Sequence, residues 1–184
     1  QQKKKDVRDK DQKEAFTYPT QQYKKTNITV TVRKRPLSKR EVDFNNFNIA
    51  RVLDNKIVVL LDPYEYNGHN EIFKNRNKEQ HYAFDYVFDE NCSQEDVYKH
   101  TVAPLLENVL EGYNCTVFAY GSTGAGKTYT MLGNEHNLGI MPQSLQGLFS
   151  LIDSIAHEQL VTVKLWYLEI YNEILRDLIK PNNE

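Results

Sequence analysis

Residues 121–128 read GSTGAGKT, and this stretch decides the fold class. It fits the pattern G-x-x-x-x-G-K-[ST] of a loop that binds nucleotide phosphates. The run CTVFAY at 115–120 precedes it and is nearly all apolar, as expected for a strand buried on both faces, and a helical segment can follow it. A chance match is the alternative, but the strand–loop–helix context favours nucleotide binding.

The residue types of this loop suit a polyphosphate. Its glycines allow backbone N–H groups to turn inward, and the following helix begins with unpaired N–H groups and a positive dipole end. Lys127 is predicted to reach the β- and γ-phosphates, and the Thr128 hydroxyl to bind Mg²⁺, so these two are the predicted catalytic residues and Thr128 the metal ligand. The predicted phosphate-binding residues are Gly121, Ser122, Thr123, Gly124, Ala125, Gly126, Lys127 and Thr128.

Hydrophobic periodicity predicts the remaining elements. Strands are expected at 28–32, 49–53, 56–61, 82–88 and 161–171, with a hairpin turn at Asp54-Asn55 and a long polar loop at 62–80. Helices are expected from an N-cap at Ser93 to a stop at Gly112, over 141–156 and over 172–178. Strands and helices alternate in the second half, whereas the first half is rich in strands. We therefore predict an α/β fold with a mixed, mainly parallel central sheet and helices on both faces.

Composition excludes several classes of protein. The 184 residues are 40% hydrophobic. Their net charge of −2 does not indicate a nucleic-acid partner. No apolar run approaches the roughly 20 residues that span a membrane, and two cysteines are too few for a disulfide scaffold. Residues 1–27 carry eight Lys or Arg against four Asp or Glu and few aliphatic residues, so we expect a mobile basic arm. It is either a solvated tail or an arm that touches an acidic polymer.

Other phosphate-loop classes fit less well. In GTPases and small-molecule kinases this loop usually lies near the start of the domain, whereas here 120 residues precede it. A guanine-reading N-K-x-D motif is also missing, because Asn55-Lys56 is followed by Ile57 and Val58.

Four segments, in order along the chain, resemble the kinesin motor domain. They are VRKRP at 32–36, FDYVFD at 84–89, the stretch 114–131 around the phosphate loop, and YLEIYNE at 167–173 with RDL at 176–178. The resemblance covers about residues 27–181. The forms GYNCTV at 112–117 and MLG at 131–133 are most similar to the kinesin-8 subfamily.

The resemblance implies a P-loop NTPase of the kinesin type, which binds ATP or ADP with Mg²⁺ and is a microtubule-stimulated ATPase and motor. It assigns the adenine side of the site to Arg33, Arg35, Pro36 and Tyr129. An aromatic ring suits stacking on a purine, although a strand-end charge pair and a core tyrosine are the alternatives. The loop at 62–80 can touch acidic tubulin in this family, or be simply solvated; its cations are Lys74, Arg76 and Lys78.

Two switch motifs of the family, of the N-x-x-S-S-R-S-H and D-x-A-G-S-E types, do not occur in this sequence. Residues 28–184 therefore resemble the N-terminal half of a motor domain, with a sheet incomplete at its C-terminal end, and we expect this segment alone to be inactive. The resemblance further implies movement on microtubules and control of their length, a cytoplasmic, cytoskeletal location, and a homodimer formed through regions beyond this chain. A nucleotide-binding microtubule regulator that does not cycle and an unrelated P-loop NTPase remain the alternatives.

Overall fold

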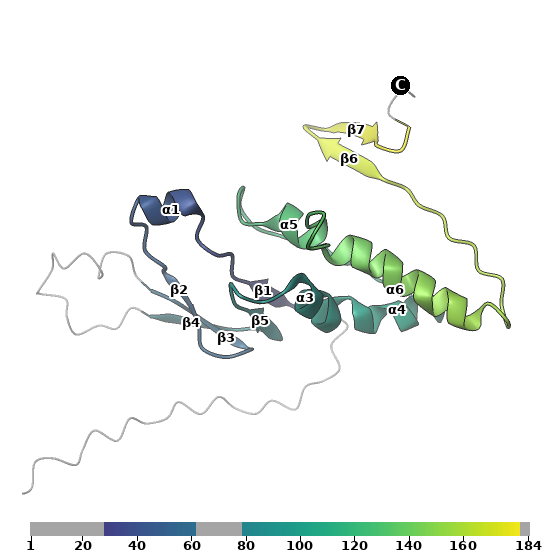
Figure 1. The fold of residues 1–184 in the computed structure, drawn as a ribbon, viewed down its shortest axis with the longest axis horizontal. Helices are drawn as coiled ribbons and strands as arrows, with labels where there is room; N and C mark the ends of the chain where they lie inside the picture. Colours follow the sequence, from purple (N-terminus) through teal and green to yellow (C-terminus); the bar gives the residue numbers. More distant parts are fainter. Residues whose placement is uncertain (1–27, 62–78, 181–184) are drawn as a thin grey trace, which may run out of the picture.

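The computed structural model describes residues 28–61 and 79–180. The expected arm at 1–27 and the cations Lys74, Arg76 and Lys78 lie outside the described residues. Small sheets and a layer of helices make up the described part (Figure 1).

The strands β1 (Thr31–Arg33) and β5 (Tyr86–Phe88) form a parallel pair. The backbone N–H of Lys34 donates to the carbonyl of Phe88 at 2.9 Å and extends the pair beyond β1. Val87 and Phe88 are buried, so β5 carries the pair into the core. This pair is the only parallel one among the described strands. Arg33 at its end bonds Gln94 of α3 and Thr130 of α5.

A separate antiparallel sheet contains β2 (Ala50–Val52), β3 (Ile57–Leu60) and β4 (Gln80–Ala83). The turn between β2 and β3 is held by Asp54, whose Oδ1 accepts the N–H of Lys56 at 2.7 Å. A side-chain carboxylate that accepts backbone N–H groups two or three residues later is typical of such turns. The predicted hairpin at Asp54-Asn55 is therefore confirmed.

Residues 82–88, expected as one strand, divide between two sheets at Asp85. The N–H of Val30 donates to Asp85 Oδ2 at 2.7 Å, and the N–H of Asp85 donates to the Val30 carbonyl at 3.0 Å. This pairing turns the chain away from β4 and starts β5 beside β1. A single uninterrupted strand was therefore the wrong prediction, because Asp85 bonds Val30 through both its side chain and its backbone.

Three helices cover β5: α3 (Gln94–Thr101), α4 (Ala103–Leu110) and α6 (Ile140–Ile155). Figure 1 shows α6 running alongside α4. Apolar side chains from β5 and from all three helices form one buried cluster, which consists of Phe88, Val97, Val102, Leu106 and Ile140. None of the described helices is both long and apolar enough to cross a membrane.

The helix expected from Ser93 to Gly112 has the predicted ends but is two helices. Ser93 accepts the N–H of Asp96, whose side chain accepts the N–H of Ser93, so the capping box is present. The break falls at Val102, and Pro104 then lies in the first turn of α4, where its missing N–H costs no helical hydrogen bond. Gly112 follows α4 with a φ of 94°, which glycine adopts readily.

The expected central sheet is not formed by the described residues. Residues 115–120 have no regular secondary structure and pair with no described strand, and Phe118 and Tyr120 are 81% and 95% exposed. A run that is apolar on both faces becomes a buried strand only where neighbouring strands accept its backbone bonds. None of the residues 28–61 or 79–180 supplies such a neighbour.

The end of the described chain also differs from expectation. Only β6 (Leu168–Tyr171) forms within the strand predicted at 161–171, and residues 174–177, predicted as helix, form β7 (Ile174–Asp177). The two strands pair as an antiparallel hairpin through Asn172 and Glu173, whose φ angles are 49° and 64°. Two successive residues at positive φ fit a tight hairpin turn and stop a helix, which explains the wrong prediction.

Candidate nucleotide-binding site

Residues 121–126 form a tight loop immediately before α5 (Lys127–Met131). The N–H of Ala125 donates to the carbonyl of Ser122 at 3.1 Å. Gly124 and Gly126 have φ angles of 81° and 97°, in the region that favours glycine. A Cβ at Gly124 would meet nothing within 4 Å, so the loop is open at that point to a ligand.

The side chain of Lys127 folds back across this loop. Its Nζ donates to the carbonyl oxygens of Gly121 and Ser122, each at 2.9 Å. In the described part of the chain no carboxylate pairs with this ammonium group. Two neutral acceptors leave its charge uncompensated, so the cation suits an anion that enters the loop. The residues present therefore fit a polyphosphate.

Thr128 is the second residue of α5 and is exposed beside Lys127. Across residues 28–61 and 79–180, no three His, Cys, Asp or Glu side chains gather as a metal site. A Mg²⁺ ion here would therefore depend on the Thr128 hydroxyl together with phosphate oxygens and water, which is how this ion is commonly held with nucleotides.

Arg33 reaches from the end of β1 to α5. Its guanidinium carbon lies 5.2 Å from the centroid of the Tyr129 ring, and its Nη1 donates to Thr130 Oγ1 at 3.1 Å. Burial is the largest influence on this group and lowers the pKa of Arg33, while Tyr129 and Cys92 oppose that shift. The guanidinium therefore occupies one side of the tyrosine ring, which is 43% exposed.

Arg35 and Pro36 lie where the chain leaves β1. The Arg35 Nη2 donates to Glu41 Oε1 at 2.6 Å, and its Nη1 donates to the Pro36 carbonyl at 3.0 Å. The hydrogen bond from Arg35 and those from Ser38 lower the pKa of the Glu41 carboxyl to about 2. A Cβ at Gly126 would lie 3.9 Å from Arg35 Cδ, so the arginine stem borders the phosphate loop.

The structure therefore brings the two predicted halves of the site together around α5. Arg33, at the end of β1, lies over the ring of Tyr129, which is 96 positions later in the chain. Arg35, just beyond β1, borders Gly126, which is 91 positions later. The predicted microtubule contacts at 74–78 lie outside the described residues.

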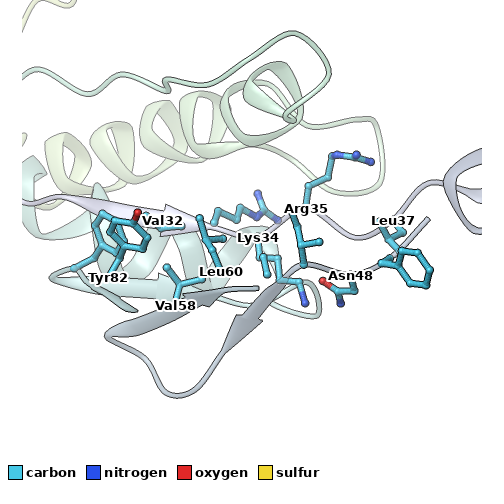
Figure 2. Close-up of a pocket in the computed structure, with 13 residues that line it drawn as sticks. Val32, Lys34, Arg35, Leu37, Asn48, Val58, Leu60 and Tyr82 are labelled. Carbon is cyan, nitrogen blue, oxygen red and sulfur yellow. The ribbon is translucent and has the colours of Figure 1, made fainter. Parts of the chain in front are cut away.

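A hollow of about 510 Å³ is lined in part by Arg33 and Arg35, two of the predicted adenine-side residues, but it does not include the phosphate loop. Its walls include Val58, Leu60 and Tyr82 from β3 and β4, and none of its lining residues belongs to 121–128. Figure 2 shows Lys34 turned toward Asn48 and Arg35 turned away from it. Of the cations in its wall, the Lys34 ammonium is paired with Glu90 at 2.8 Å and the Arg35 guanidinium with Glu41 at 2.6 Å.

Sequence reasoning missed two residues of this region, Glu41 and Gln94. Glu41 closes the capping box of α1 (Lys39–Asp43) with Ser38 and pairs with Arg35. The letters SKRE at 38–41 carry this capping signal. Gln94 directly follows Ser93 and is buried against Arg33 and α5. The sequence contains no signal for this contact, because a glutamine in the first turn of a helix is usually exposed.

The glycine loop is crossed by the side chain of Lys127, and Thr128 follows this lysine at the start of α5. This arrangement defines a P-loop nucleotide-binding protein. The family model described as the kinesin motor domain matches residues 33–184. The chain belongs to the kinesin motor domain family.

Curated relatives agree with this assignment. Kinesin-like protein KIF19 of Mus musculus is 44% identical over 158 residues, which are 86% of this chain and 16% of the relative. Kinesin-like protein KIF18B of Gallus gallus is 42% identical over 84% of this chain and 20% of its own length. Kinesin-like protein KIN-8B of Arabidopsis thaliana is 39% identical over 87% of this chain and 19% of its own length. The similarity to kinesin-8 proteins is thereby confirmed, and the chain spans at most a fifth of the length of these relatives.

Proposed function

We propose that this chain is the nucleotide-binding part of an ATP-driven microtubule motor. One observation carries the proposal: in a chain of the kinesin motor domain family, the Lys127 ammonium lies inside an open glycine loop without a carboxylate partner among the described residues. A motor that cycles must bind and release a nucleotide at such a site, and phosphoryl transfer depends mainly on positioning and electrostatics.

Within this proposal each predicted residue has a role. The backbone of 121–126 and Lys127 hold the phosphates, and Thr128 binds Mg²⁺, which neutralises charge on the phosphate oxygens. Arg35 and Pro36 border the base side of the site. Because Arg33 occupies one side of the Tyr129 ring, the purine would stack on the other side.

The partner and the cellular role belong to the whole protein. We propose binding to microtubules, with Lys74, Arg76 and Lys78 as salt-dependent contacts to acidic tubulin. The kinesin-8 type of the relatives supports control of microtubule length, a cytoskeletal location in the cytoplasm, and a homodimer formed elsewhere in the protein. We propose neither a nucleic acid nor a membrane as a binding partner. Residues 1–184 lack both switch motifs, so on their own they should bind nucleotide without turning it over.

The test is the ATPase rate of the complete motor with and without microtubules, compared between the natural protein and the Lys127→Ala variant. We expect strong stimulation by microtubules in the natural protein and a rate at least about 100-fold lower in the variant, because the loop loses the cation that holds the phosphates. Lys99→Ala is the matched control, since Lys99 is exposed on α3 and pairs only with Glu95 in the described structure.

Each alternative function predicts a different result. Bound nucleotide with no turnover, with or without microtubules, would mean a non-cycling regulator. ATP hydrolysis at a rate that microtubules do not change would mean a P-loop enzyme that is not a motor. If the Lys127→Ala variant binds nucleotide with unchanged affinity, residues 121–128 are not the phosphate-binding loop.

A further inference from the structure

Gln94 is the one polar or charged residue that is buried in the described part of the chain, with 6% of its surface exposed. It is the first residue of α3, so the capping box of Ser93 and Asp96 fixes its backbone. A buried amide costs free energy unless its hydrogen bonds are made. The partners of Gln94 therefore show what this side chain holds in place.

Both ends of the Gln94 amide are bonded to other segments. Its Oε1 accepts from Arg33 Nη1 at 2.5 Å, and its Nε2 donates to the Tyr129 carbonyl at 2.6 Å and the Asn137 carbonyl at 3.5 Å. One side chain thus connects the end of β1, the middle of α5 and the turn that precedes α6. Two of these segments border the phosphate loop.

Arg33 completes the connection from the other direction. Besides Gln94 it bonds the Thr130 hydroxyl at 3.1 Å and the Cys92 carbonyl at 3.4 Å, and it lies over the Tyr129 ring. All of these partners are neutral. The guanidinium is half-buried and is held by neighbours on several sides, so in this arrangement it has little freedom to reach a base.

The helix α5 is too short to hold its own direction, and its packing onto the buried cluster comes from Met131, at the end opposite to Lys127. It has five residues, none of them buried, and its N-cap Gly126 provides no side-chain hydrogen bond. An isolated helix of this length is not stable in water. Lys127 and Thr128 are its first two residues, so whatever fixes the turn at Tyr129 and Thr130 also fixes the directions of these two side chains.

We propose that Gln94, with Arg33 as its partner, is a positioning residue that holds α5 so that Lys127 and Thr128 meet the phosphates and Mg²⁺. In this role Arg33 acts on the phosphate side of the site through α5 rather than by contact with the base. The inference rests on the proposed nucleotide-binding function and adds a residue that the phosphate-loop motif does not contain.

The connection that Gln94 makes between Arg33 and α5, called the clamp below, requires an amide at position 94. A carboxylate at position 94 would still accept from Arg33, but it would turn an oxygen toward the carbonyl oxygens of Tyr129 and Asn137, with no proton between them. Gln94→Glu therefore breaks the connection to α5 while it keeps the connection to Arg33. Gln143 is a matched control, because its Nε2 donates to the Leu138 carbonyl at 2.6 Å and its side chain has no hydrogen bond to Arg33 or α5 in the described structure.

The experiment uses the complete motor and two competitors of a fluorescent ATP analogue: ATP and inorganic tripolyphosphate, which has no base. We expect Gln94→Glu to weaken both competitors by the same factor, about tenfold, because the phosphate loop itself is displaced. The Mg²⁺ concentration needed for half-maximal binding should rise in parallel. Gln143→Glu should leave both affinities and the Mg²⁺ requirement unchanged.

Other results would overturn the proposal. A loss for ATP without a loss for tripolyphosphate would place the effect at the base. A lower melting temperature with both affinities intact would leave Gln94 a purely structural residue. If Gln94→Glu does not fold, Thr130→Val removes one acceptor of Arg33 and should weaken both competitors about threefold; no effect there also refutes the clamp. If the natural protein binds neither ATP nor tripolyphosphate, the proposed nucleotide-binding function itself is refuted, independently of the role of Gln94.

Discussion

The helices around β5 and the hairpin at the end of the described chain both carry large apolar side chains, but these side chains have different surroundings. Phe88, Val97 and Leu106 are buried among α3, α4 and α6. By contrast, every residue of β6 and β7 is exposed, and Figure 1 shows this hairpin standing apart from the helices. An apolar residue contributes to stability only when another element covers it, so the two regions should respond very differently to the same substitution.

The largest difference should appear between Phe88→Ala and Ile170→Ala. Phe88 is 1% exposed, and its truncation should lower the free energy of unfolding by about 3–5 kcal/mol, because the cavity adds to the lost burial. Ile170 is 74% exposed, and its truncation should cost less than about 0.5 kcal/mol. Denaturant unfolding of the two variants measures both values. Equal costs would mean that other parts of the protein cover the hairpin, and the contrast between the regions would disappear.

A second substitution tests how closely the helical layer is packed. A Cβ at Gly147 of α6 would lie only 2.2 Å from Tyr98 Oη and 2.9 Å from Leu106 Cδ1. Gly147→Ala should therefore destabilise the protein by about 1–3 kcal/mol, although alanine is the better helix former. Tyr98→Phe removes the nearest atom, so the double variant should recover most of the loss. If the single variant is as stable as the natural protein, Tyr98 moves freely and the layer is looser than the structure shows.

The smallest effect is expected at the exposed cap of α1, and it depends on pH. The bonds from Arg35 and Ser38 hold the pKa of Glu41 at about 2, below its usual value near 4.3. A lowered pKa in the folded state contributes stability above the unfolded pKa and loses it as pH falls through the folded pKa. The contribution should therefore be complete above about pH 5 and disappear toward pH 2.

Glu41→Gln isolates this contribution. The difference in denaturation midpoint between the natural protein and the variant should be present at pH 6 and shrink on acidification to pH 2. Because the carboxyl is exposed to solvent, the difference should also decrease in high salt. A difference that stays constant across this pH range would mean that the Glu41 charge does not stabilise the cap.

The sequence was most informative where a pattern acts locally. The loop at 121–128, the turn at Asp54, the cap at Ser93 and the helix at 141–156 each depend on residues within a few positions of one another, and the structure has the turn, the cap and the helix at these places. It was least informative where pairing partners decide. The run at 115–120 has the composition of a central strand, yet it pairs with no described strand.

Sequence alone is enough for the glycine motif with Lys127 and Thr128, the turn at Asp54, the cap at Ser93, and membership of the kinesin motor domain family. The contact between Arg33 and Gln94 beside α5, and the position of Arg35 next to Gly126, emerge only from the three-dimensional packing. Separation along the chain explains this division. Caps and loops close through neighbouring residues, whereas the amide of Gln94 meets partners 61 and 35 positions away, which are set by how β1, α3 and α5 pack together.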